Sequence, residues 1–202
     1  MLGSLITGFK GDLAGNLFSA LIGLCLVAAY CLLGAGWLIM KTEGALQRKA
    51  VAWARGSLWF TAAGVAAISF AMPLVSARIF DKWFSFPNLV MLFPIPAVTL
   101  VLFGVMARSL RRLPTRLAQN NQYGAGVPFA CTVGVFLLAF YGLAYSLFPW
   151  LVVDRLTLWQ AASAPEALMV IFYGAVVVLP VIVGYTVYAH RVFWGKSTAL
   201  HY

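Results

Sequence analysis

Charged residues are scarce in this chain, and their scarcity has a regular pattern. Of the 202 residues, 9% are charged and 63% are apolar, whereas soluble domains average about 25% charged and about 45–50% apolar residues. Five stretches contain no Asp, Glu, Lys or Arg: residues 13–40, 56–77, 83–107, 117–153 and 167–189. Each can supply the roughly 20 apolar residues that a transmembrane helix needs. The sequence therefore predicts an all-α integral membrane protein with about five transmembrane helices and no separate water-soluble domain.

Ionisable side chains are missing from the interiors of all the predicted spans. Such a group at the bilayer centre costs about 2.5–3.5 kcal/mol on insertion scales, so it is retained mainly for function. We therefore expect no complete proton path and no coupling-ion site through these helices. This argues against an ion-coupled transporter, while passive conduction stays open.

Residues that ligate metals or haem are also few. The two histidines are His190, which closes the last predicted span, and His201, next to the last residue. They do not provide two haem ligands at one membrane depth. The cysteines, at positions 25, 31 and 131, lie inside predicted spans without a Cys-x-x-Cys pair, so neither covalent haem nor zinc is indicated. We expect this chain to carry no catalytic residue, cofactor site or metal site of its own.

Basic residues outnumber acidic ones by 14 to 5, and they are divided unequally between the two sides of the membrane. Four fall on one side, at positions 10, 78, 82 and 155, and ten on the other, at positions 41, 48, 49, 55, 108, 111, 112, 116, 191 and 196. The positive-inside rule places the ten in the cytoplasm, with the N-terminus outside and the C-terminus inside. We interpret the basic connections as topology signals with some attraction for anionic lipid headgroups. No nucleic-acid-binding motif accompanies them.

The chain divides into a short outer tail (residues 1–16), a single transmembrane helical domain (17–190) and a cytoplasmic tail (191–202). Glycines at positions 23, 34 and 36 of the first span allow another helix to approach closely, either within the chain's own bundle or from a partner. Two prolines at 94 and 96 should kink the third span or delay its start. Before the last span, Ser163 and Glu166 have capping-box spacing.

The most distinctive segment is residues 34–44, Gly-Ala-Gly-Trp-Leu-Ile-Met-Lys-Thr-Glu-Gly, where an apolar helix gives way to a polar exit. Trp37 either anchors the helix at headgroup depth or stacks on a quinone. Lys41 and Glu43 are two residues apart and do not share a helix face. Either Lys41 snorkels at the membrane edge beside a solvated Glu43, or the two contact a partner subunit.

This segment resembles the run that subunit II of cytochrome bd-type quinol oxidases carries where a helix leaves the membrane. A second stretch, Leu-Thr-Leu-Trp-Gln-Ala-Ala at residues 156–162 followed by Ser-Ala-Pro-Glu, resembles the loop before the last helix of that subunit. The last span with its Pro180, and the ending Arg-Val-Phe-Trp-Gly-Lys at residues 191–196, are also similar. The resemblance covers the C-terminal portion of the subunit, about its last five transmembrane helices.

The resemblance implies a fold in which one helix precedes the second four-helix bundle of the subunit. It also implies a complex that oxidises quinol and reduces dioxygen to water in aerobic respiration, in a bacterial cytoplasmic (inner) membrane. In this family haem b, haem d and the quinol site belong to the larger subunit I, and subunit II is its structural partner. We expect this chain to contact subunit I, membrane lipid and the quinone pool, with candidate contacts at Gly34, Gly36, Trp37, Lys41 and Glu43.

The family's subunit II usually begins with a helix block that has no counterpart here. We therefore expect an N-terminally truncated subunit, with Met1 as an internal start. Two other functions stay open at this point: a stand-alone small permease or channel, and a fragment that inserts but does not assemble.

Overall fold

The computed structural model describes residues 2–7, 12–75, 77–86, 90, 92–119, 121–152, 156–193 and 195. The long helices are α2 (Leu13–Lys41), α3 (Gly44–Val75), α6 (Pro94–Ala118), α7 (Val127–Leu147) and α9 (Pro165–Val192). The short helix α1 (Leu2–Ile6) precedes α2. Other short elements lie between the long helices: α4 (Ala77–Phe84), α8 (Leu158–Ala161), and two strands, β1 (Trp150–Val152) and β2 (Leu156–Thr157), which pair antiparallel. The five long helices are long and apolar enough to cross a membrane, which confirms the expected all-α membrane fold.

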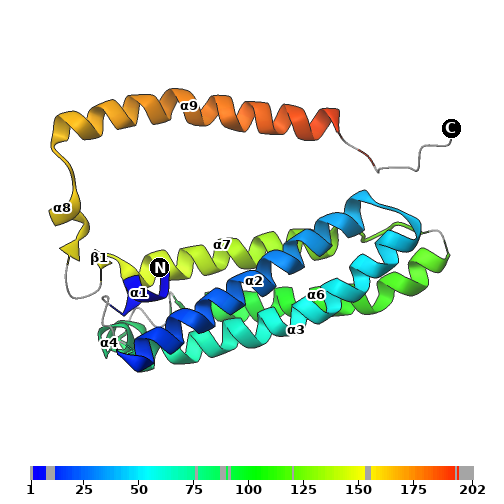
Figure 1. The fold of residues 1–202 in the computed structure, drawn as a ribbon, viewed down its shortest axis with the longest axis horizontal. Helices are drawn as coiled ribbons and strands as arrows, with labels where there is room; N and C mark the ends of the chain where they lie inside the picture. The colour runs from blue at the N-terminus through cyan, green and yellow to red at the C-terminus, as the bar shows by residue number, and fades with distance from the viewer. Residues whose placement is uncertain are drawn as a thin grey trace.

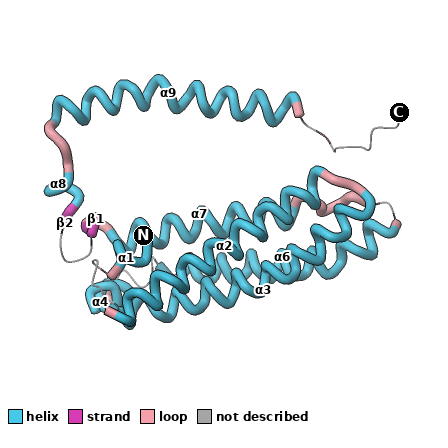
Figure 2. Tube along the Cα trace, viewed as in Figure 1, coloured by secondary structure: helices cyan, strands magenta, loops and turns pink. Residues whose placement is uncertain are grey.

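Helices α2, α3, α6 and α7 pack into one elongated bundle (Figures 1 and 2). Its larger buried cluster lies where α2 and α6 end and where α3 and α7 begin, and it includes Leu32, Ile39, Leu58, Met106 and Leu110. A smaller cluster of Ile6, Phe18 and Met72 closes the opposite end. The bundle is therefore packed most completely at the end where the connections α2–α3 and α6–α7 lie.

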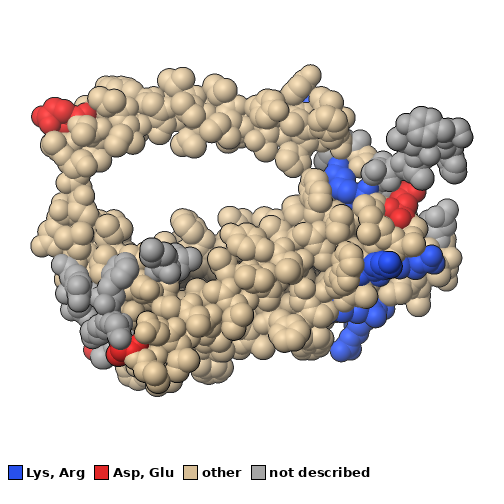
Figure 3. Space-filling model, viewed as in Figure 1, with Lys and Arg blue, Asp and Glu red and all other residues tan. Residues whose placement is uncertain are grey.

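Helix α9 stands outside this bundle. It is joined to α7 through the β-hairpin and α8, and it runs beside the bundle with open space between them (Figures 1 and 3). None of its residues is buried. The resemblance placed one separate helix before a four-helix bundle, whereas here the first four long helices form the bundle and the last one stands apart.

The helices extend beyond the charge-free stretches of the sequence. Helix α2 begins at Leu13, four residues before the expected start, because Asp12 caps it through a hydrogen bond from Gly15 N to its Oδ1 (3.2 Å). The basic residues expected in connections lie largely on helix ends, with Arg55 on α3 and Arg108 on α6. Arginine and lysine are good helix formers, so leaving the apolar region does not end a helix.

Proline fixes two helix starts, one as predicted and one not. Helix α6 begins at Pro94, which confirms that the prolines delay the third span. The prediction of a capping box formed by Ser163 and Glu166 is wrong. Ala164 is the N-cap of α9, and it makes no side-chain hydrogen bond. Pro165 occupies the first helical position, which proline favours, so the cap falls on Ala164. A capping box forms instead at α8, where Thr157 and Gln160 bond reciprocally.

Candidate functional site at the junction of α2, α7 and α9

Four of the five candidate contact residues lie on the C-terminal half of α2, and Glu43 follows its end. The two glycines among them have different surroundings. A Cβ atom on Gly36 would lie 3.1 Å from both the N and the Cα of Phe129, so Gly36 allows α2 and α7 to touch through their backbones. A Cβ atom on Gly34 would meet nothing within 4 Å. Gly36 therefore serves the chain's own bundle, whereas Gly34 leaves an open place on α2.

Trp37 connects the bundle to α9. Its ring lies 5.2 Å from the ring of Phe129 on α7 and 5.7 Å, edge-on, from the ring of His190 on α9 (centroid distances). Such tilted and edge-to-face pairs each contribute about 0.5–1.5 kcal/mol beyond the area they bury. The indole thus lies between α7 and the last turn of α9.

Lys41, the last residue of α2, binds the C-terminal end of α9 across the space between α9 and the bundle. Its Nζ donates hydrogen bonds to the carbonyls of Phe193 (2.9 Å) and Gly195 (3.3 Å), and it lies 5.3 Å from the centroid of the Trp37 ring. Phe193 is the C-cap of α9. The last carbonyls of a helix lack intrahelical donors and carry partial negative charge, so an ammonium group there is favourable.

Glu43 is exposed in the connection between α2 and α3. The residues around it explain the abrupt polar exit. Thr42 ends α2, donating from its N–H and its hydroxyl to the carbonyl of Leu38 (2.9 and 2.7 Å). Gly44 then starts α3 at φ +68°, a conformation that glycine adopts without the steric cost of a side chain. The Thr-Glu-Gly sequence is therefore a tight helix-to-helix turn.

Two polar residues at this end of the bundle, Gln47 and Arg55, have structural roles that the sequence analysis did not predict. Gln47 is buried, and its Nε2 donates to the carbonyl of Ile39 (2.8 Å) and to Oε1 of Gln122 (3.0 Å). It thus satisfies a carbonyl in the last turn of α2 and joins the α2–α3 turn to the α6–α7 connection. No charge marks this residue in the sequence.

Arg55 repairs a break in α6. Pro114 has no N–H, so the carbonyl of Leu110, four residues earlier, loses its helical donor. Arg55 on α3 supplies two donors to that carbonyl, from Nη2 at 2.7 Å and from Nε at 3.2 Å. The proline inside a basic helix end is the sequence signal that predicts the need for an external donor here.

The chain also matches a known family over almost its whole length. The family model for cytochrome bd terminal oxidase subunit II matches residues 1–193, from the first residue to the C-cap of α9. This chain belongs to that family. No curated protein matches it by sequence. As a cytochrome bd subunit II, the chain is a multi-pass membrane protein and a subunit of an oxidoreductase complex that contains haem and a partner oxidase subunit.

Histidine and cysteine are the residues of this cytochrome bd subunit that bear on a haem or metal site. His190 is exposed at the end of α9, where its Nδ1 lies 2.8 Å from the carbonyl of Thr186. Cys25 and Cys131 lie within α2 and α7, and His201 is outside the described residues. Over the part of the chain that the structure describes, His, Cys, Asp and Glu form no group of three or more that could hold a metal ion.

Proposed function

We propose that this chain is the structural membrane partner of a haem-bearing subunit I in a quinol:dioxygen oxidoreductase. The observation that carries the proposal is the family match over residues 1–193. In this proposal haem b, haem d and the quinol site lie on subunit I, and electrons pass from quinol to dioxygen there. This chain supplies packing surface and membrane anchorage, and it contributes no catalytic residue.

The exposure of α9 supports a role for this helix in assembly with a partner subunit. Its 28 residues are predominantly apolar and none is buried, yet both ends are held to the bundle, one by the β-hairpin and the other by Lys41 and Trp37. Pro180 lies within it and removes the donor for the carbonyl of Val176. An unpaired carbonyl in hydrocarbon is costly, and neighbouring helices commonly satisfy it. A partner helix against α9 fits both features.

The candidate contacts take distinct roles in this proposal. Trp37 and Lys41 position α9, Gly36 closes the bundle, and the open place at Gly34 can accept a residue of the partner. Glu43, exposed at the same end, belongs to the surface around this position. These assignments follow from the contacts described above, and each can be tested by substitution.

The proposed orientation places the end with Lys41 in the cytoplasm of a bacterial inner membrane. Figure 3 shows that the Lys and Arg side chains of this face gather at the end of the bundle where α2 meets α3. The positive-inside rule assigns such an end to the cytoplasmic side. The N-terminus then lies outside.

The test is co-purification with a spectrum. The full chain, tagged at its C-terminus and extracted gently from its native host, is expected to carry a larger membrane subunit. The reduced-minus-oxidised visible spectrum should show bands of haem b and haem d. The matched control is a tagged, unrelated membrane protein from the same host, processed in the same way.

Each outcome separates the candidate functions. Haem bands and a larger subunit in the tagged sample alone support the oxidase assignment. A colourless, well-folded preparation without a larger subunit contradicts it and leaves the permease and the non-assembling fragment. Solute flux through liposomes that contain the chain alone would then select the permease.

A further inference from the structure

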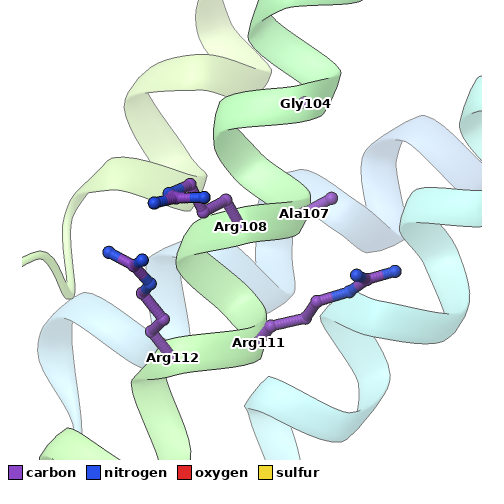
Figure 4. A pocket seen from close by; sticks show the side chains of 5 residues that line it. All are labelled: Gly104, Ala107, Arg108, Arg111 and Arg112. Atoms are coloured by element: carbon purple, nitrogen blue, oxygen red, sulfur yellow. The ribbon is translucent and has the colours of Figure 1, made fainter.

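A cluster of arginines flanks a hollow on the last turns of α6. Arg108, Arg111 and Arg112, with Gly104 and Ala107, line an open depression of about 300 Å³ on this one helix. Figure 4 shows the side chains of Arg108 and Arg112 extending to one side of the helix and that of Arg111 to the other. We call this feature the α6 basic hollow.

The charges in the α6 basic hollow are not balanced within the described part of the chain. Arg108, Arg111 and Arg112 are exposed, and Arg108 precedes the other two by three and four residues, a spacing at which like charges repel on a helix. No described acidic side chain pairs with any of them. Asp12 caps the far end of α2, Glu43 lies in the α2–α3 connection, Asp81 lies on α4, and Glu166 lies in the first turn of α9. The hollow therefore fits an anion, and guanidinium groups bind phosphate oxygens in bidentate geometry.

The surface below the arginines is apolar. Gly104 lies one turn deeper on α6 than Arg108, and a Cβ atom there would meet nothing within 4 Å. The side chains of Val105, next to Gly104, and of Val101, three residues deeper than Gly104, are also exposed. Arg108 itself lies four residues, about 6 Å of helix rise, deeper than Arg112. A ligand that fits this sequence of surfaces has a phosphate at one end and a hydrocarbon chain at the other.

We propose that the α6 basic hollow binds one anionic phospholipid, with its phosphate between Arg108 and Arg112 and an acyl chain along Gly104, Val101 and Val105. Basic pockets at the cytoplasmic ends of transmembrane helices are suited to such headgroups. The site differs from the general attraction of a basic surface, because it combines a hollow, two guanidinium groups on the same side of α6 and an open apolar path. It is independent of the proposed oxidase function.

Native mass spectrometry of the full chain in mild detergent tests the proposal. Dioleoyl phosphatidylglycerol and dioleoyl phosphatidylethanolamine are titrated separately, so that only the headgroup differs. The wild type should bind one phosphatidylglycerol in preference to phosphatidylethanolamine. The double substitution R108Q/R112Q should weaken phosphatidylglycerol binding by about tenfold or more, since each basic residue near a headgroup contributes a factor of about five. A third titration with inorganic phosphate should leave the lipid adduct in place.

Two matched controls distinguish lipid binding at the α6 basic hollow from general attraction of the lipid to positive charges at this end of the bundle. R48Q/K49Q removes two exposed charges from α3 at the same end of the bundle and should change phosphatidylglycerol binding less than twofold. Gly104→Leu should weaken lipid binding with all charges kept, whereas Gly56→Leu, at an equally open helix position, should not.

Three results would overturn the proposal. These are an equal loss in R108Q/R112Q and R48Q/K49Q, equal binding of the two lipids to the wild type, and full displacement of the lipid by inorganic phosphate. R108K/R112K keeps the charge and should retain binding within a few-fold. Retained binding in this variant shows that substitution at these two positions does not by itself abolish the site.

Discussion

Arg55 should be important for stability only because Pro114 breaks the hydrogen-bond ladder of α6. Replacing Arg55 by Leu removes both donors, at 2.7 and 3.2 Å, from the carbonyl of Leu110. Hydrogen bonds that involve a charged group contribute about 1.5–3 kcal/mol. Arg55 is exposed, so we take the lower end and expect the free energy of unfolding to fall by about 1.5 kcal/mol. Arg48→Leu, one heptad earlier on the same helix face, is the control and should cost less than about 0.5 kcal/mol.

Pro114→Ala tests whether the missing N–H of Pro114 is the reason that Arg55 contributes to stability. Alanine restores an N–H that can donate to the carbonyl of Leu110, so the guanidinium is no longer its sole donor. In the Pro114→Ala background, Arg55→Leu should cost no more than about 0.5 kcal/mol. The double-mutant cycle should therefore give a coupling energy of about 1 kcal/mol, within the range measured for residues that share a partner.

The assay is reversible unfolding in mixed micelles by titration with sodium dodecyl sulfate, followed by far-ultraviolet circular dichroism. All four proteins of the cycle, and Arg48→Leu, are measured at one micelle concentration. The reasoning is refuted if Arg55→Leu costs the same with proline and with alanine at position 114. It is equally refuted if Arg48→Leu costs as much as Arg55→Leu.

Three further predictions concern the junction at the end of α2. Gly36→Ala should destabilise the bundle by about 1–3 kcal/mol because the new Cβ meets the α7 backbone, whereas Gly34→Ala should be neutral or stabilise by up to about 1 kcal/mol; equal effects in the same unfolding assay would contradict this. Lys41→Met should loosen the C-terminal end of α9, seen as a broader distance distribution between spin labels on α2 and α9; an unchanged distribution would show that Lys41 does not hold it. Gln47→Leu should cost about 1–3 kcal/mol by leaving the carbonyl of Ile39 buried without its donor, and a cost below about 0.5 kcal/mol would exclude that role.

The transmembrane character of this chain is predictable from its sequence because long apolar stretches without charged residues are sufficient to indicate it. Stretches without charge give the five spans, and Pro94 correctly sets the start of α6. Helix ends are less predictable, since α3 and α6 continue through their arginines. The capping box shows the same limit. Ser163 and Glu166 have suitable spacing, but Pro165 places the cap on a residue with no hydroxyl.

The position of the candidate site in the sequence was predictable, but the contacts of its residues were not. Residues 34–44 contact both α7 and α9, but these contacts depend on residues far away in the sequence. Whether Gly34 or Gly36 faces another helix depends on where α7 lies, and the carbonyl that binds Lys41 is 152 residues away. The separation of α9 from the bundle is also invisible to hydropathy, because apolar residues face lipid and protein alike.

The central claim, that this chain serves as a structural partner of a haem-bearing subunit, is tested most directly by photo-crosslinking from α9 in native membranes. A photoreactive residue is placed at Leu179 or at Val181, on different faces of the helix, with Tyr123 in the α6–α7 connection as the control position. The account predicts a covalent adduct to a larger, haem-containing subunit from at least one α9 position and none from Tyr123. Adducts only to lipid, or only to a second copy of this chain, from both α9 positions would contradict it.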